Sequence, residues 1–323
     1  MKCTATYLLA ILLACPFVSS AQDEEKDTDL TTQVTDTTAK DTTWKKGGVL
    51  NINFNQVSLT NWAAGGKSSV AFSGLFSYFA NLKKGRHTWD NNVDLAYGRL
   101  IQDGGDDSKT DDRLEFASKY GYEIKGPWYA SYLLSFKTQF DEGFDPVLDS
   151  LKISEFMSPA YVITGPGIDY KPKENISVFF SPVEYKATIV LDQDLADVGQ
   201  FGVDAAEFDD LGNKTKNGQN LRSEFGAYIK IWYTEELMKN VTFMTKLDLF
   251  SNYLDRPENI DVTWETLFTL KVNEWLSASL NTLLIYDHDI GIIQETGDAD
   301  NPVKVGPATQ FKQTFGAGLS LKI

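Results

Sequence analysis

An alternation of apolar and polar residues recurs from residue 47 to the C-terminus and limits the chain to few folds. Leu50, Ile52 and Phe54 alternate with asparagines, and residues 69–82 continue in the same way. Successive side chains of a β-strand point to opposite faces, so each segment has one apolar face. Similar segments begin at or near Thr88, Arg113, Trp128, Tyr161, Ile176, Arg222, Val241, Ile260, Leu276 and Phe311. The chain is predicted to be all-β with about 12 strands.

The connections between these segments alternate in length. Short turns are expected at residues 83–87, 124–127, 171–175, 234–240 and 273–274. Generally longer loops are expected at residues 56–67, 101–110, 141–159, 192–220, 254–259 and 287–307. Transmembrane barrels combine an even strand number with short periplasmic turns and long extracellular loops. We therefore predict a transmembrane antiparallel β-barrel. A secreted β-sandwich is the alternative, but it explains neither this alternation nor apolar faces on nearly every strand.

Aromatic residues gather at both ends of the predicted strands. By the short turns lie Trp89, Tyr122, Trp128, Tyr170, Trp232 and Trp275, and by the long loops lie Tyr97, Phe140, Tyr161, Tyr253 and Tyr286. Such rows form the interfacial girdles of membrane barrels, so outer-membrane lipid is an expected partner. After Phe180 the apolar positions change parity, which predicts a β-bulge near Pro182.

The N-terminal segment has the features of a secretory signal peptide at residues 1–21. Lys2 precedes an apolar run, and small residues end at Ala21. Residues 22–43 are rich in Thr and Asp and are expected to be a disordered periplasmic leader before a barrel of residues 44–323. Lipidation at Cys15 is an alternative processing route. Because Cys3 and Cys15 are the only cysteines, ordinary cleavage leaves a chain without thiols or disulfides.

The charge and the few histidines narrow the possible chemistry. A net charge of −15 argues against nucleic-acid binding. His87 lies in a short turn, and His288 lies between Asp287 and Asp289, which leaves an aspartate–histidine protease rim as a minor hypothesis. Acidic clusters at 103–112, 192–210 and 298–300 lack the spacing of a calcium loop. We expect no enzymatic activity, no catalytic residue, no metal and no cofactor.

Four short segments carry a family resemblance. They are residues 55–66 (NQVSLTNWAAGG), 153–161 (ISEFMSPAY), 179–182 (FFSP), and 195–197 (LAD) with 201–203 (FGV). The chain resembles a Bacteroidetes outer-membrane barrel family known only as a domain of unknown function, number 3078. The resemblance implies the outer membrane of a Gram-negative cell and offers no activity, substrate or catalytic residue.

The polar strand faces would line the barrel interior and hold charges of both signs. The lumen-lining candidates are Asp90, Asp94, Arg113, Glu115, Lys119, Lys137, Arg222, Glu224, Lys230, Lys246, Asp248, Asp261, Glu265 and Lys271. Two functions stay open. One is a passive channel for small polar solutes; the other is a barrel closed by ion pairs and by Phe79, Tyr129, Tyr228 and Phe250, acting as a surface interaction or structural protein. The barrel-insertion machinery is a further expected partner, because Gly318, Leu321 and Ile323 resemble its terminal recognition signal.

Overall fold

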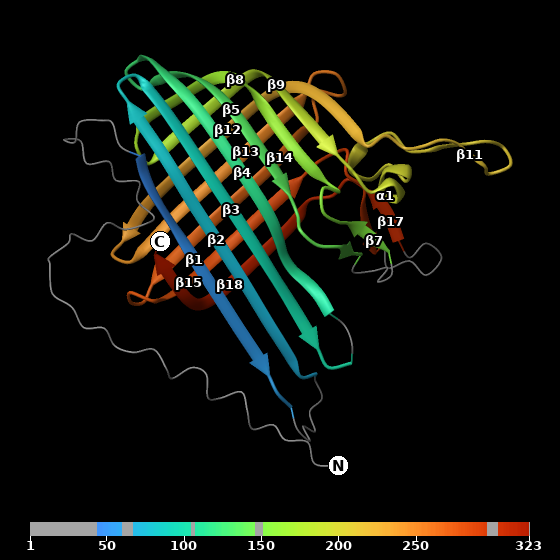
Figure 1. Ribbon diagram of the computed structural model, residues 1–323, viewed down its shortest axis with the longest axis horizontal. Helices are drawn as coiled ribbons and strands as arrows, with labels where there is room; N and C mark the ends of the chain where they lie inside the picture. The colour runs from blue at the N-terminus through green and yellow to red at the C-terminus, as the bar shows by residue number, and fades with distance from the viewer. Residues whose placement is uncertain (1–43, 60–66, 105–106, 146–150, 296–302, 323) are drawn as a thin grey trace.

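The computed structural model describes residues 44–59, 67–104, 107–145, 151–295 and 303–322 (Figure 1). The predicted signal peptide and leader, part of the first family-like segment (60–66) and the acidic cluster at 298–300 lie outside these ranges. The described strands form a closed barrel in the order β1-β18-β15-β14-β13-β12-β9-β8-β5-β4-β3-β2. All twelve neighbouring pairs are antiparallel. The predicted twelve-stranded antiparallel barrel is confirmed.

Each barrel strand pairs with the next one along the chain, and β1 pairs with β18 to close the ring. The barrel strands are β1 (Trp44–Val57), β2 (Ser69–Lys84), β3 (His87–Gln102), β4 (Asp107–Lys125), β5 (Trp128–Thr138), β8 (Ala160–Lys173), β9 (Ile176–Ile189), β12 (Leu221–Met238), β13 (Val241–Asn252), β14 (Ile260–Lys271), β15 (Leu276–Tyr286) and β18 (Gln310–Lys322). Strand pairing therefore follows directly from the predicted sequence of hairpins, as in up-and-down barrels.

Small elements occupy three of the long loops. They are the strand pairs β6 (Gly143–Phe144) with β7 (Lys152–Ser154), β10 (Glu207–Phe208) with β11 (Lys214–Lys216), and β16 (Ile292–Glu295) with β17 (Val303–Gly306), and the short helices α1 (Gln193–Asp197) and η1 (Gln200–Gly202). In the part of the chain that the structure describes, no helix is long and apolar enough to cross a membrane.

The outer face of the barrel is apolar and carries aromatic pairs near the short turns. The rings of Trp44 and Trp89 lie 5.6 Å apart, and those of Trp128 and Tyr170 lie 4.5 Å apart. Large apolar side chains such as Trp264 are exposed on the outer face. In a water-soluble protein such a surface would be unfavourable, whereas lipid contact makes it favourable.

A bulge interrupts β9 where the parity change predicts it. The β8–β9 register shifts between Thr164 and Ile168, and the β12–β9 register shifts between Gly226 and Tyr228. The Ser181 hydroxyl donates to the Pro166 carbonyl (2.8 Å), which satisfies one backbone group that the bulge frees. One extra residue re-phases a strand, so residues after Pro182 reach the opposite face.

Two expectations about boundaries need correction. Most of the predicted loop 101–110 belongs to β3 and β4, whose register continues to Ile101 and Asp107. Lys109 stabilises this extension, since its ammonium pairs with Asp112 (2.8 Å) and donates to the Asp141 carbonyl (2.9 Å). The predicted short turn 234–240 lies mostly within β12, which runs to Met238 and leaves residues 239–240 as the turn.

Glycine in β8 makes room for an interior aromatic ring. A Cβ on Gly167 would lie 2.6 Å from the Phe179 ring on β9. This glycine therefore has a packing role, because it lets a large ring lie against the backbone.

Candidate functional site: the charged interior and the loop-end pocket

The inward faces carry opposite charges at adjacent positions. In the strand register, Glu115 lies opposite Lys137 and Lys230 lies opposite Asp248. The Lys230 ammonium lies 3.0 Å from the Asp248 carboxylate, and Lys137 lies 3.7 Å from Glu115. Cross-strand pairs of opposite charge stabilise a sheet. Because these contacts join neighbouring strands, they do not show how wide the lumen is.

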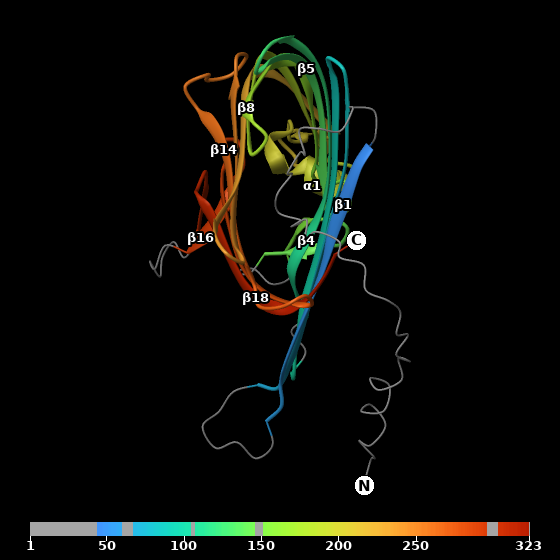
Figure 2. The same cartoon turned by 90° about the vertical axis from the view of Figure 1, so that its left-hand side faces the viewer.

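Two further ion pairs join opposite walls of the barrel. The Arg113 guanidinium on β4 lies 3.2 Å from the Glu265 carboxylate on β14, and five strands separate β4 from β14 in either direction round the ring. The Lys246 ammonium on β13 lies 3.6 Å from the Asp94 carboxylate on β3, again with five strands on each side. In Figure 2 the wall containing β4 faces the wall containing β14 across the narrow dimension of an oval barrel.

Other ion pairs join strands that are neither neighbours nor on directly opposite walls. Lys137 on β5 lies 3.7 Å from Asp248 on β13, and Lys171 on β8 lies 2.8 Å from Asp90 on β3. Lys186 on β9 lies 2.7 Å from Asp261 on β14. Together with the opposite-wall pairs, these contacts place a network of ion pairs in the middle of the barrel.

Of the fourteen lumen-lining candidates, thirteen form ion pairs: Asp90, Asp94, Arg113, Glu115, Lys119, Lys137, Arg222, Glu224, Lys230, Lys246, Asp248, Asp261 and Glu265. The fourteenth, Lys271, is exposed at the end of β14. That these residues line a passage for solutes stays a prediction.

Sequence reasoning missed several members of the network. Asp169 and Lys171 lie on β8, where the glycines conceal the strand pattern; Asp169 is fully buried and lies 2.5 Å from Lys119. Lys186 follows the bulge in β9, so its inward position depends on the parity change. Extending the alternation beyond Pro182 would have identified Lys186.

An aromatic cluster fills the interior on the side of β5, β9, β12 and β13. Leu133, Phe179, Tyr228 and Phe250 are each 0–4% exposed and pack together. The ammonium of Lys186 lies 5.0 Å from the centre of the Phe250 ring, within the range of a cation–π contact. Tyr129 is also buried, whereas Phe79 is half-buried. Apolar filling thus replaces water on one side of the lumen.

Several charges of the network remain partly accessible to solvent. The side chains of Arg113, Glu115, Lys137, Lys230 and Lys246 keep between 22% and 27% of their exposure. The network is therefore partly hydrated, and its ion pairs avoid part of the desolvation cost of a dry interior.

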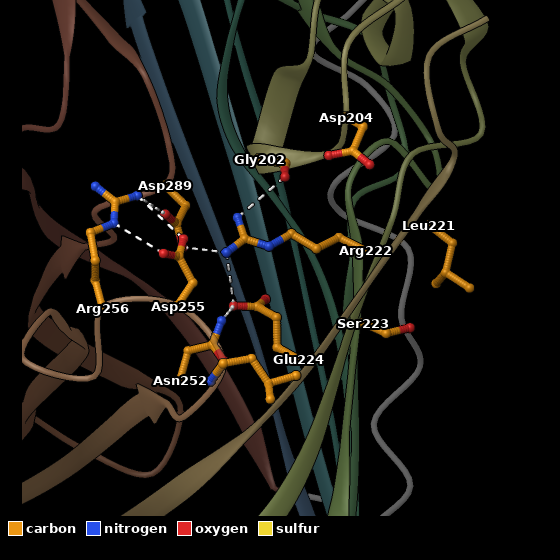
Figure 3. Close-up of a pocket in the computed structure, with 11 residues that line it drawn as sticks. Gly202, Asp204, Leu221, Arg222, Ser223, Glu224, Asn252, Asp255, Arg256 and Asp289 are labelled. Atoms are coloured by element: carbon orange, nitrogen blue, oxygen red, sulfur yellow. Dashed lines mark hydrogen bonds and ion pairs between the residues drawn. The ribbon is translucent and has the colours of Figure 1, made fainter.

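A pocket of about 490 Å³ opens at the long-loop end of the barrel, above the network (Figure 3). Arg222 donates to the Gly202 carbonyl (3.2 Å) and lies 3.1 Å from Glu224 and 2.6 Å from Asp289. Asn252 also donates to Glu224 (3.1 Å). Figure 3 shows the Arg222 guanidinium between Gly202 on one side and Glu224 on the other.

Arg256 holds the other side of this pocket. Its guanidinium pairs with Asp255 (3.3 Å) and lies 3.5 Å from Asp289. The pocket thus contains two arginines and four carboxylates, those of Asp204, Glu224, Asp255 and Asp289, which leaves it negative overall. Its chemistry suits a small cationic or zwitterionic ligand better than an anion.

The acidic loop 192–220 folds into a small unit at the rim. Val190, Leu195, Ala196 and Val203 form its core, and the Asp192 side chain caps α1 by accepting from the Leu195 amide (2.9 Å). The β10–β11 hairpin projects away from the barrel mouth (Figure 1). This hairpin therefore does not constrict the lumen.

Hydrogen bonds to its carboxylate stabilise the charged form of Asp197 in the same loop. The Lys214 ammonium, the Gly218 amide (2.8 Å) and the Gln193 amide (2.7 Å) all donate to it. They lower the pKa of Asp197 to about 2. This loop therefore has its own polar core in addition to the apolar one.

The polar contacts of the two histidine side chains are with tyrosine and arginine side chains. His288 Nε2 lies 3.0 Å from Arg256, and Nδ1 lies 3.3 Å from the Tyr286 hydroxyl. His87, at the start of β3 and not in the turn as predicted, lies 2.5 Å from the Tyr120 hydroxyl. Among the described residues, no group of three or more His, Cys, Asp and Glu side chains is arranged to hold a metal ion.

Comparisons with known proteins address the family and the fold. The sequence model of a family described as Protein of unknown function (DUF3078) matches residues 54–144. The predicted resemblance to this family is confirmed over this part of the chain, and an origin in the Bacteroidetes stays a prediction. The matched region runs from the end of β1 to β6 and includes Asp94 and Arg113. No protein of curated function matches the chain.

Three solved structures with similar folds are membrane barrels. An outer membrane channel from Pseudomonas putida F1 shares 12% identity over 90% of this chain and 99% of its own, with a TM-score of 0.35. The translocator domain of the autotransporter NalP from Neisseria meningitidis shares 7% identity over 88% and 89%, with a TM-score of 0.34. The CymD monoaromatic hydrocarbon channel shares 9% identity over 88% of each chain, with a TM-score of 0.30.

Proposed function

We propose that the chain is an outer-membrane barrel of a Gram-negative cell, closed to solutes by its interior network, whose long-loop end acts as a binding surface. The observation that carries this proposal is the Arg113–Glu265 ion pair between opposite walls. A passage for a sugar or amino acid must keep the two walls apart, whereas these side chains meet in the middle of the lumen. Of the two functions that the sequence suggested, we therefore favour the closed barrel over the passive channel.

The outer-membrane location is supported by the apolar outer face and by the alternation of short turns and long loops. It agrees with a cleaved signal peptide and a periplasmic leader, which stay proposals. The loop-end pocket with Arg222 and Asp289 gives the exposed end a site for a small polar ligand.

A narrow ion path is the second candidate function. It is favoured by the residual exposure of charges such as Lys246, because water and small ions follow the same accessible space. Within the network the charges are interleaved, so a path here would have weak selectivity between cations and anions. Such a path would conduct ions without admitting larger solutes.

Conductance in planar bilayers separates the two functions. We expect the native barrel to show little or no stable conductance, and the double variant Arg113→Gln/Glu265→Gln to show frequent openings. Deletion of residues 205–216 is the matched control. It should leave the conductance unchanged, since this hairpin projects away from the mouth. A large, steady conductance of the native protein would overturn the closed barrel. A small conductance that persists in high-molecular-weight polyethylene glycol, a polymer too large to enter a narrow path, would support the ion path.

A further inference from the structure

The short-turn end of the barrel carries a cluster of positive charge on one side. Strands β1 to β4 are consecutive neighbours in the wall, and their ends together cover about 15 Å (Figure 1). The same stretches of chain, residues 44–48, 82–88 and 121–128, contain a single acidic residue, Glu123. Six exposed cations lie there, and we call them the basic corner: Lys45, Lys46, Lys83, Lys84, Arg86 and Lys125.

Arg86 joins two turns of the basic corner. Its guanidinium donates to the backbone carbonyls of Glu123 (2.9 Å) and Ile124 (2.9 Å) at the end of β4, and it lies 4.7 Å from the centre of the Tyr122 ring. These contacts fix the position of the cation without supplying a negative charge. Among the described residues, none of the five lysines of the basic corner has an ion-pair partner. The basic corner is therefore a fixed surface whose charge is not neutralised by the barrel.

The other short turns differ from the basic corner, because each of them has acidic residues close to its lysine. Attraction for a chain with many negative charges is therefore concentrated on the side of β1 to β4. The residues of the other three turns are Lys173 with Glu174, Lys239 with Glu235 and Glu236, and Lys271 with Glu274.

A segment of opposite charge comes directly before the basic corner in the chain. Residues 22–43 hold seven acidic and two basic residues, and they lead into Trp44 and Lys45 at the start of β1. A polar chain of 22 residues has an average end-to-end distance of roughly 25 Å. Such a chain can reach every cation of the basic corner. Because the two parts are covalently joined, their effective concentration is on the order of millimolar.

The directions of the lysines favour a chain over a lipid headgroup as the occupant. Trp44 lies on the outer face of the barrel, and successive side chains of a strand point to opposite faces. Lys46 and Lys84 therefore share the outer face with Trp44. Lys45 and Lys83 share the inner face. A headgroup in the bilayer reaches the outer face alone, whereas a segment that continues from Trp44 can contact both.

We propose that the acidic leader, residues 22–43, binds to the basic corner by ion pairing. The proposal rests on cleavage of the chain after Ala21 and on the proposed membrane location, which sets the basic corner in periplasmic water. It goes beyond the closed lumen, because it assigns a partner to the end of the barrel opposite the loop-end pocket. The bound leader competes with any other polyanion in the periplasm for this surface.

Zero-length cross-linking tests this contact without any substitution. A carbodiimide joins a carboxylate to an amine only where the two groups touch, and mass spectrometry identifies the joined residues. In residues 22–323 reconstituted in phosphatidylcholine nanodiscs, which leave both ends of the barrel accessible, we expect cross-links from the leader to Lys83, Lys84 and Lys125. Products at Lys45 and Lys46 are not informative, because these lysines are close to the leader in sequence. Raising NaCl from about 0.1 M to about 1 M shortens the Debye length from about 10 Å to about 3 Å and should lower the yield at least threefold.

Tryptic cleavage after Lys26 and Lys40 measures the protection of the leader. In the triple variant Lys83→Gln/Lys84→Gln/Lys125→Gln, we expect cleavage at these two sites at least threefold faster than in the native chain. The matched control is Lys173→Gln/Lys239→Gln/Lys271→Gln, which removes the same charge from the other short turns. Its leader should be cleaved at the native rate.

The mobility shift on heating reports whether each variant is folded. With that shift intact, absence of cross-links to Lys83, Lys84 and Lys125, or equal leader cleavage in the two triple variants, would overturn the leader as the partner and leave the barrel unaffected. Loss of the cross-links in nanodiscs that contain phosphatidylglycerol would identify anionic lipid as the occupant and would also overturn it. Failure of the native chain to insert into phosphatidylcholine vesicles would instead overturn the membrane location on which the proposal rests.

Discussion

The ammonium of Lys246 on β13 lies 3.6 Å from the carboxylate of Asp94 on β3, on the opposite wall of the barrel. Asp94 is further held by a hydrogen bond from Ser77 (2.5 Å) on the neighbouring strand. One wall thus positions the carboxylate, and the other supplies the counter-charge. The contact determines how closely the two walls approach.

Exchanging these two charges should be tolerated better than removing one. Loss of one partner of a buried ion pair costs about 3–5 kcal/mol, and the partial hydration here should reduce this to roughly 2–3 kcal/mol. We expect Lys246→Ala and Asp94→Ala each to lower the free energy of unfolding by that amount in urea titrations of the lipid-reconstituted barrel. The double exchange Asp94→Lys/Lys246→Asp should recover at least half of the loss. No recovery would mean that the residues act independently.

The last five residues should be essential for closure. All registered contacts between β18 and β1 involve residues 319–322. Deleting residues 319–323 therefore removes the whole seam and leaves two strand edges unpaired in lipid. We expect unassembled, protease-sensitive protein without the mobility shift on heating that folded barrels show. Deleting hairpin residues 209–213, an equal number, should leave that shift intact. A heat-modifiable barrel after the C-terminal deletion would contradict this prediction.

The orientation can be tested with epitope tags on intact cells. Leu211 lies at the tip of the projecting β10–β11 hairpin, and Gly85 lies in the short β2–β3 turn at the other end of the barrel. A tag after Leu211 should be reached by antibody on intact cells, and a tag after Gly85 only after the outer membrane is permeabilised. The converse labelling would reverse the topology.

Much of the fold could be predicted from the sequence because barrel strands follow a local rule. Residues such as Leu50 and Asn51 show which face of a strand is apolar. The loop lengths distinguish the end with short turns from the end with long loops. The contacts across the lumen could not be predicted. Arg113 and Glu265 are 152 positions apart, and their meeting depends on the oval shape and the strand stagger.

The rim loop also escaped prediction, for a different reason. Its core residues Val190, Leu195 and Val203 have no regular spacing, so neither a helical nor a strand period reveals them. The hydrogen bonds that organise the loop converge on Asp197 from residues up to 21 positions away. In the sequence these residues form only an acidic cluster, which indicates a solvated surface.

The rim loop should loosen in acid. Hydrogen bonds from Lys214, Gly218 and Gln193 lower the pKa of Asp197 from 3.8 to about 2. Because the folded value lies below the unfolded one, the stabilisation is present above about pH 4 and is lost as the pH falls through 2. We expect amide protection factors of residues 193–220 to drop over that range. Asp197→Asn should already show low protection at pH 6, whereas Asp210→Asn, exposed on the hairpin, should behave like the native chain.

The last prediction concerns Glu184, which lies fully buried on β9 beside the aromatic cluster. Neither carboxylate oxygen has a hydrogen-bond partner, since the nearby Ser181 hydroxyl donates to Pro166 instead. A buried polar group without a partner costs roughly 1–3 kcal/mol. Glu184→Met keeps the length of the side chain and removes the polar atoms. We therefore expect it to raise the free energy of unfolding by about that amount in urea titrations with lipid.

Glu224 provides the matched control, because it is also nearly fully buried but well partnered. It accepts from Arg222 and Asn252 at 3.1 Å and lies 3.6 Å from Lys186. Glu224→Met removes a counter-charge from the buried Lys186 and from the half-buried Arg222, so it should destabilise the barrel by about 3–5 kcal/mol. Opposite signs for the two substitutions would separate burial from pairing as the source of the effect. Destabilisation by both would mean that Glu184 contributes to the fold through its charge, contrary to this prediction.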